Sequence, residues 1–409
     1  MSLAAPTAGQ RRVFLHVGAP KTGTTFLQDV LWTNRAALVE AGVCYPLRRA
    51  DEHFAATMDL RQMAWGRERD PQWEGAWERI AARVRAWPGP TAVISNELLG
   101  GASAEQVAAA VASLAPAQVH VVFTARDLAR QLPSDWQEHL KHLHVVPFDR
   151  FVEDLVELGT AAPAPFGEMF WRLHDPVDVL DRWVSAVPAA HVHLVTVPQP
   201  DAPTGLLWER FAAILGLDPA AFDTNVGRSN TSLGVVDCEL LRRVNRHLRG
   251  KIDLRHYDPL VRLRLTSILL AAARPGPASE KLTLPASLHP WALERSRELV
   301  AGIEAAGYEV VGDLDELLPP RPTGGTPSLQ PAEVDSDALL ESALVAISGL
   351  LRDLAHGRDQ RAEHEAQLAR WRQRPLRQWL IDRSGSSRTL MAARRGYWWL
   401  ANQAKGRHG

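Results

Sequence analysis

Residues 13–26 read VFLHVGAPKTGTTF, so that an apolar strand, a loop with two glycines and the start of a helix follow one another. This succession is typical of phosphate-binding sites, because the first backbone N–H groups of a helix have no partner within the helix and bind anions. In the Walker A pattern G-x-x-x-x-G-K-[ST], Gly18, Gly23 and Thr25 fit, but Thr24 stands where the lysine belongs. The lysine of this stretch lies inside the loop instead.

The position of that lysine, Lys21, argues against a nucleoside triphosphate as the ligand. In P-loop NTPases the lysine after the second glycine reaches the β- and γ-phosphates, and the next Ser/Thr holds Mg²⁺. Lysine is also scarce, with five against 41 arginines, so a lysine in the loop goes against the composition. A compact ammonium suits a bridging oxygen better than a planar guanidinium does. We therefore predict a site for a shorter anion.

A second candidate anion contact follows the strand predicted over residues 118–124, QVHVVFT. Arg126 follows this strand after Ala125, and Ser134 comes eight residues after Arg126. A guanidinium and a hydroxyl are suitable ligands for a terminal phosphate that ordinary ATP lacks.

Together and in this order, the PKTGTTF loop and the Arg126–Ser134 pair resemble the donor site of sulfotransferases that use 3′-phosphoadenosine 5′-phosphosulfate (PAPS). The wording HVGAPKTGTTFLQ is similar to the bacterial members in particular. The resemblance implies that Arg126 and Ser134 hold the 3′-phosphate and that the loop holds the 5′-phosphosulfate. The loop residues that it places there are Lys21, Thr22, Gly23, Thr24 and Thr25. The chain departs from the family at residues 197–199, VPQ, where an acidic residue usually follows the strand.

Two further donor contacts rest on looser matches. Phe26 stands where many relatives have Trp, and it either stacks on adenine or belongs to the core side of the first helix. Arg228, within GRSNTSLG (residues 227–234), is placed like a late loop that closes over the 3′-phosphate end of PAPS. In the alternative, Ser229 or Asn230 only caps the following helix.

Transfer to a hydroxyl needs a base that accepts the hydroxyl proton, and two residues are candidates. Glu97 falls just past the strand predicted over residues 91–95, at the sheet edge where α/β proteins bind ligands. The surrounding residues 94–99, ISNELL, are similar to a Ser-Ser-Glu phrase in bacterial relatives. His53 lies in a predicted loop where those relatives carry a histidine. A histidine, with an ordinary pKa of about 6.5, suits neutral pH better than a carboxylate, whose pKa burial must raise. His53 is therefore slightly favoured.

The predicted mechanism is an in-line displacement at sulfur without a metal ion. Lys21 and the loop amides would stabilise the charge on the leaving phosphate, while His53 or Glu97 takes the proton. The histidines of HLKHLH, residues 139–144, lack a metal-binding pattern such as H-E-x-x-H and are predicted to form a polar helix face.

Apolar strands alternate with helical segments along the chain, which predicts an α/β fold with a P-loop-type parallel sheet flanked by helices. The expected strands are residues 12–17, 91–95, 118–124 and 191–197. The expected helices include residues 24–41, 73–87, 104–113, 135–143, 148–158 and 206–217.

Composition sets further limits. Of 409 residues 46% are hydrophobic, enough for a large core, and the formal net charge of −1 gives no reason to expect nucleic acid as a partner. Cys44 and Cys238 lie far apart in the sequence, so neither a disulfide framework nor a metal site is indicated. The first ten residues lack a signal-peptide core, and no apolar run is long enough to span a bilayer. We expect a cytoplasmic protein.

The character of the chain changes near residue 317. Residues 317–327, LLPPRPTGGTP, are typical of a linker. Residues 335–371 carry apolar side chains at helical spacing, which predicts a helix that either pairs with a second copy in a homodimer or folds back on the chain. Residues 372–409 hold nine Lys/Arg among aromatic residues. This suits contact with a membrane surface, peripherally at the inner membrane, or with a polyanion; in the alternative it is a packed terminal helix. We predict a sulfotransferase-like domain over 1–317, a linker over 318–334 and an extension over 335–409.

Three functions remain open from the sequence. The first is a PAPS-dependent sulfotransferase acting on a hydroxyl, with a glycan or glycolipid as candidate acceptor. The second is a P-loop kinase or NTPase, which Thr24 at the lysine position disfavours. The third is a non-catalytic protein that acts through its C-terminal helix and basic tail.

Overall fold

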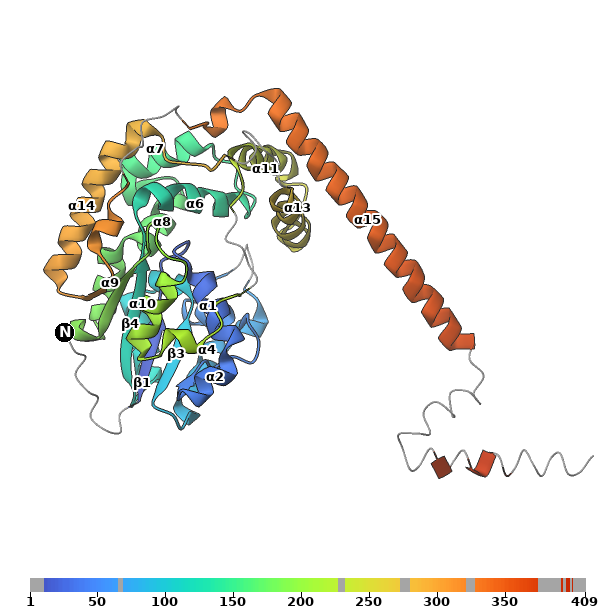
Figure 1. The fold of residues 1–409 in the computed structure, drawn as a ribbon, viewed down its shortest axis with the longest axis horizontal. Coiled ribbons are helices and arrows are strands. Elements are labelled where there is room, and N and C mark those ends of the chain that lie inside the picture. Colours follow the sequence, from blue (N-terminus) through green and yellow to red (C-terminus); the bar gives the residue numbers. More distant parts are fainter. Residues whose placement is uncertain are drawn as a thin grey trace, which may run out of the picture. The chain divides into compact units, whose positions relative to one another are not determined.

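The computed structural model describes residues 11–64, 69–226, 232–272, 280–320 and 328–373, with a few residues nearer the C-terminus. Its centre is one sheet of six parallel strands in the order β2-β3-β1-β4-β5-β6, with helices on both faces (Figure 1). The strands are β1 Arg12–His16, β2 Val43–Cys44, β3 Thr91–Ser95, β4 Gln118–Ala125, β5 Val192–Thr196 and β6 Glu309–Val311. The predicted α/β class is confirmed.

The helices account for most of the remaining chain. They are α1 Thr24–Thr33, α2 Arg35–Glu40, α3 Glu52–Leu60, α4 Ala76–Ala86, α5 Ala104–Ser113, α6 Leu128–Leu140, α7 Phe148–Leu158, α8 Phe166–His174, α9 Pro176–Val184, α10 Leu206–Leu215, α11 Val235–Leu248, α12 Leu254–Tyr257, α13 Thr266–Ala271, α14 His289–Ala306 and α15 Ser336–Gln373.

The strand residues alternate between two apolar cores, because successive side chains of a strand point to opposite faces. Val13 and Leu15 of β1 belong to the core that also holds Trp183 of α9 and residues of α4, α5 and α14. Phe14 belongs to the other core, with Leu27 of α1 and residues of α10. Both faces of the sheet are therefore buried, which explains why its inner strands read as continuous apolar runs.

The strand order places the end of β1 at a switch point. β1 pairs with β3 on one side and with β4 on the other. After β1 the chain forms β2 and β3 on one side of it, and then crosses to form β4 on the other side. Ligands of open α/β sheets bind in the crevice outside the carboxyl ends of the strands at such a point. The carboxyl ends of β1, β3 and β4 therefore position the candidate site.

The structure departs from the sequence-based elements in several places. β2 and β6 were not predicted, and the single helix expected over residues 24–41 is interrupted at Asn34. α6 begins at Leu128 rather than at residue 135, with Pro133 inside the helix. His53 lies in α3 and not in a loop.

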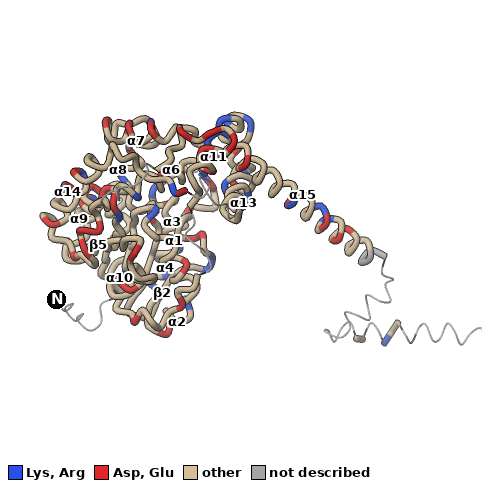
Figure 2. Tube along the Cα trace, turned by 45° about the horizontal axis from the view of Figure 1, so that its top comes forward, with Lys and Arg blue, Asp and Glu red and all other residues tan. Residues whose placement is uncertain are grey.

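The chain divides into two compact units, Met1–Leu344 and Val345–Gly409. Within the first unit, Ser342 in the first turns of α15 donates a hydrogen bond of 2.5 Å to Asp237 of α11, and both residues are buried. Acidic and basic residues are interspersed along the helices of this unit (Figure 2).

The second unit contains the remainder of α15, where Ile347, Leu351 and Leu354 are exposed. Most of the basic segment predicted over residues 372–409 lies outside the described residues. Among the helices that the structure describes, none has the length and apolar character needed to cross a bilayer.

Candidate active site

The predicted anion-binding loop lies at the carboxyl end of β1 and leads directly into α1. Gly18 and Gly23 have φ angles of +138° and +87°, a region that favours glycine. A Cβ at Gly23 would stand 2.5 Å from Leu207 Cδ2, and one at Gly18 would stand 3.3 Å from the carbonyl oxygen of Glu97. The positive φ angles therefore favour glycine at both positions, and a side chain at Gly23 would also displace Leu207.

The N-terminus of α1 is left without a side-chain cap. Gly23 is the N-cap residue and has no side chain to offer, and the first turn contains no acidic residue. The N–H groups of Thr24, Thr25 and Phe26 occupy the positions that a helix leaves unpaired, at the positive end of its dipole. This helix end can therefore accept an anionic ligand group.

Buried hydroxyls hold the loop against the sheet. Thr22 Oγ1 lies 2.5 Å from both Ala19 O and Thr124 Oγ1, and Thr124 Oγ1 donates to Gly18 O at 2.8 Å. The side chain of Thr22 thus shapes the loop from inside, which leaves the loop amides and Lys21 to face a ligand.

A histidine lies beneath these hydroxyls. His16 Nδ1 is 2.8 Å from Ser95 Oγ, and its Nε2 is 3.3 Å from Thr124 Oγ1. Burial lowers the pKa of His16 to about 3, so the ring is neutral at physiological pH. Ser95 and Thr124, which support the loop, were not among the predicted site residues, although each is a polar residue near the end of an apolar strand.

Lys21 extends from the loop toward α6. Its backbone has a φ of 63°, and its Nζ lies 3.0 Å from Glu138 Oε2. Burial raises the pKa of Glu138, but His142, Lys21 and Lys141 together outweigh this effect and hold the pKa well below its ordinary value. An ionised Glu138 therefore orients the Lys21 ammonium, which remains partly exposed.

Arg126 lies at the end of β4 and is linked to the loop through a single amide. Its Nε donates to Gln131 Oε1 at 3.2 Å, while Gln131 Nε2 donates to Pro20 O at 2.7 Å. Burial lowers the pKa of Arg126 to about 10, so the guanidinium stays charged at neutral pH. Ser134 lies three residues after Gln131 in α6, on the same helix face, and is half-buried.

Glu97 and His53 both lie near the end of β3, in different surroundings. Gln28 of α1 donates to Glu97 Oε2 at 3.1 Å, which places this carboxylate one turn along the helix that carries the loop amides. Glu97 is half-buried. Its carboxylate thus stands beside the helix that would bind the anion.

His53 is 3% exposed and packs edge-on against Tyr45, with ring centroids 4.9 Å apart. Its Nδ1 lies 3.1 Å from Ser95 O and 3.2 Å from Ser95 N, where the two-residue β2 has already ended. Its Nε2 is buried without a partner among the described residues. Burial lowers the pKa of His53 to about 3. The ring therefore completes the sheet edge in place of a strand.

The histidines of residues 139–144 do not form the polar helix face that we predicted, since His139 is buried. His139 Nε2 and His174 Nε2 each lie 3.1 Å from a carboxylate oxygen of Asp135. His174 Nδ1 is also 2.8 Å from Gln131 Nε2, so this cluster supports the amide that links Arg126 to the loop. Within the described chain, no group of three His, Cys, Asp or Glu is arranged to hold a metal ion.

Two predicted donor contacts stand apart from this arrangement. Phe26 is half-buried and packs against the core on the α1 face of the sheet. Arg228, together with Ser229 and Asn230, lies outside the described residues.

Comparison with solved structures gives a distant structural likeness. No protein-family model matches the chain, and no curated protein matches it. A solved sulfotransferase from Alicyclobacillus acidocaldarius is 14% identical, with a TM-score of 0.36, over 60% of this chain and 98% of that one. At this identity and score, the similarity is too distant to assign a function to the chain.

Proposed function

We propose that the protein is a sulfotransferase that moves the sulfuryl group of PAPS to a hydroxyl acceptor, with a glycan or glycolipid as the expected acceptor class. The observation that carries the proposal is the uncapped N-terminus of α1, which follows a loop whose lysine lies before the second glycine. Backbone donors and one ammonium suit the phosphate of a phosphosulfate, whereas a γ-phosphate with Mg²⁺ calls for a lysine at position 24.

The residues present fit the two charged ends of such a donor. The free N–H groups of α1 and Lys21 would hold the 5′-phosphosulfate. Arg126 and Ser134, on the same side of α6 as Gln131, would hold the 3′-phosphate. Bound PAPS would supply the sulfuryl group and a phosphate leaving group.

Lys21 would act on the leaving group. Its ammonium and the loop amides are positioned to stabilise negative charge that develops on the departing phosphate oxygen. Glu138 holds the ammonium in the loop region at 3.0 Å before any ligand arrives, which reduces the reorganisation that the reaction requires.

Glu97 is the better candidate for the base that accepts the acceptor's hydroxyl proton. Its carboxylate is half-buried beside α1 and keeps one oxygen outside the hydrogen bond from Gln28. His53 is less suitable, because burial lowers its pKa to about 3 and its Nδ1 faces the backbone of Ser95. His53 would then position the end of β3, from which Glu97 follows.

The decisive experiment measures nucleotide binding and sulfuryl transfer separately. Calorimetry with 3′-phosphoadenosine 5′-phosphate should give at least tenfold tighter binding than ADP with Mg²⁺. In Arg126→Ala this preference should disappear, while adenosine 5′-phosphosulfate binds as before, because only the 3′-phosphate contact is lost. Labelled PAPS offered with a panel of hydroxylated glycans and lipids then tests transfer. Tighter binding of ADP with Mg²⁺ would exclude the proposal.

A further inference from the structure

A separate cavity of about 640 Å³ lies between α7, α8, α14 and the N-terminal end of α9. None of its lining residues belongs to the candidate active site. Its volume is within the roughly 300–1,000 Å³ range of small-molecule sites. The cavity is therefore large enough for a short oligosaccharide or a ligand of similar size.

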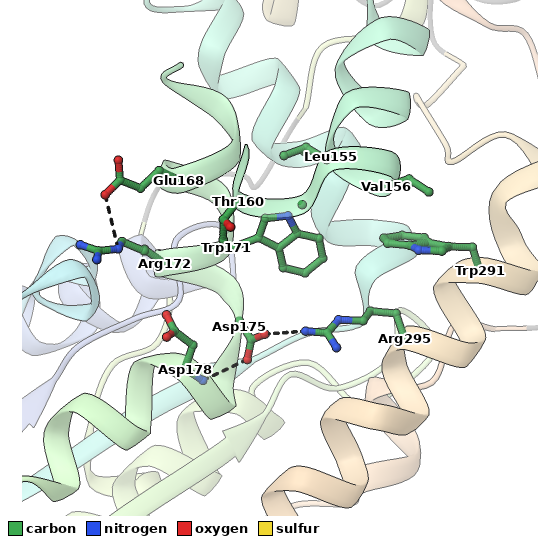
Figure 3. Close-up of a pocket in the computed structure, with 11 residues that line it drawn as sticks. Leu155, Val156, Thr160, Glu168, Trp171, Arg172, Asp175, Asp178, Trp291 and Arg295 are labelled. Carbon is green, nitrogen blue, oxygen red and sulfur yellow. Dashed lines mark hydrogen bonds and ion pairs between the residues drawn. The ribbon is translucent and has the colours of Figure 1, made fainter. Parts of the chain in front are cut away.

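Two tryptophans form the aromatic part of the lining (Figure 3). Trp171 of α8 and Trp291 of α14 have ring centroids 6.4 Å apart and planes at 74°. Trp171 is 7% exposed, and its Nε1 has no hydrogen-bond partner among the described residues. A buried indole N–H usually has a partner, so this donor is a hydrogen-bonding capacity that the described residues leave unused.

The positive groups at the cavity are already neutralised. Asp175 Oδ1 accepts the N–H groups of Val177 and Asp178 at the start of α9, and its Oδ2 accepts from Arg295 at 2.8 Å. Arg295 also pairs with Glu298 at 2.6 Å. Neither the helix end nor this guanidinium is therefore free to bind an anion.

Two carboxylates at the cavity keep accessible oxygens. The side chains of Glu168 and Asp178 are 71% and 53% exposed, although each has an arginine partner, Arg172 and Arg182 respectively. These carboxylates repel an anionic ligand electrostatically. An organic cation is disfavoured as well, because the Arg295 guanidinium lies 5.4 Å from the Trp171 ring centroid, in the position that a ligand cation would take.

We propose that this cavity binds a neutral saccharide. The half-buried indole of Trp291 offers a flat apolar surface for the C–H face of a pyranose ring. Hydroxyl groups both donate and accept hydrogen bonds, so they can pair with the Trp171 N–H as well as with the oxygens of Glu168 and Asp178. The proposal rests on the cavity's own residues and does not depend on sulfuryl transfer.

Saturation-transfer NMR and calorimetry test the proposal on the full chain with cellotriose, maltotriose, mannotriose and chitotriose. Choline and a sulfated heparin disaccharide serve as the charged alternatives. We expect saturable binding of at least one neutral trisaccharide and neither charged probe. Trp291→Ala should weaken that binding at least tenfold, about 1.4 kcal/mol.

Matched variants separate this site from other causes. Trp171→Phe, which keeps an aromatic ring but removes the N–H, should also weaken binding, whereas Trp73→Ala, at a half-buried tryptophan outside the cavity lining, should not. Absence of binding by all four trisaccharides, preference for choline or the sulfated disaccharide, or unchanged binding in Trp291→Ala would overturn the proposal.

Discussion

At the scale of single residues, Lys21 provides the most direct test of the proposed chemistry. Lys21→Ala should lower the rate of sulfuryl transfer by about 10²–10³-fold, the usual cost of one lost charge-stabilising donor, and should affect the Kd of 3′-phosphoadenosine 5′-phosphate much less. Lys141→Ala is the matched control, since Lys141 also contacts Glu138, at 3.2 Å, but lies outside the loop. Equal loss of activity in both variants would show that the charge balance of Glu138, and not the loop ammonium, matters.

The two candidate bases are also separable residue by residue. Glu97→Gln retains a partner for Gln28 but cannot accept a proton, so kcat should fall about 10²–10⁴-fold with donor binding unchanged. His53→Gln should lower the melting temperature, because the ring completes the edge of β3, and should retain most of kcat in the folded protein. Folded His53→Gln without activity beside an active Glu97→Gln would reverse the assignment.

At the scale of elements, the junction between the loop and α1 depends on glycine. Gly23→Ala combines a left-handed backbone with a Cβ placed 2.5 Å from Leu207, so it should shift the first turn of α1 and weaken nucleotide binding as well as stability. Gly216→Ala is the control, since its φ is +73° and no atom lies within 4 Å of the added Cβ. It should cost about 1–2 kcal/mol of unfolding free energy without affecting binding. Similar binding losses in the two variants would contradict this view.

Local sequence patterns were sufficient for some elements and not for others. The loop and the four longer strands follow from residues adjacent in sequence, but β2 and β6 have only two and three residues and depend on pairing at the edges of the sheet. The helix expected from residue 135 instead begins at Leu128, where Asp127 is the N-cap residue and accepts a hydrogen bond from the Arg130 N–H. The edge strands are thus set by distant partners, whereas the start of α6 has a local signal that the prediction did not use.

In the candidate site, too, features that are local in sequence were predictable and long-range contacts were not. The loop was predictable because its glycines, lysine and threonines are consecutive, whereas Glu138 lies 117 positions from Lys21 and Gln131 lies 111 positions from Pro20. The burial of His53 also depends on Tyr45 and on the early end of β2. No pattern within a short window contains this information.

At the scale of the whole molecule, buried histidines make stability depend on pH. Burial lowers the pKa values of His16, His53 and His120 to about 3, below the 6.5 expected of the unfolded chain. The stability that these neutral histidines contribute to the folded state is fully present above pH 6.5. It is lost progressively as the pH falls from 6.5 toward about 3. Below about pH 4.5 Glu52 adds to the loss, because the hydrogen bond from Arg83 lowers its pKa to about 2.

Urea unfolding followed by tryptophan fluorescence should therefore show a free energy of unfolding that decreases steadily below pH 6.5. Each buried histidine contributes a slope of about 1.4 kcal/mol per pH unit between its two pKa values. His120→Gln should reduce that slope by about 1.4 kcal/mol per pH unit, which corresponds to one proton. A free energy that stays constant from pH 7.5 to pH 4.5 would be inconsistent with neutral buried histidines.

The Gln131 side chain also has a thermodynamic consequence for ligand binding. Because this one amide contacts both Pro20 in the loop and Arg126 at β4, ordering of either group restricts the motion of the other. A ligand that binds at one end of the site thus meets a lower entropy cost at the other, which is positive cooperativity between two parts of the same molecule. A nucleotide with both phosphates should accordingly bind more tightly than the sum of its separate halves implies.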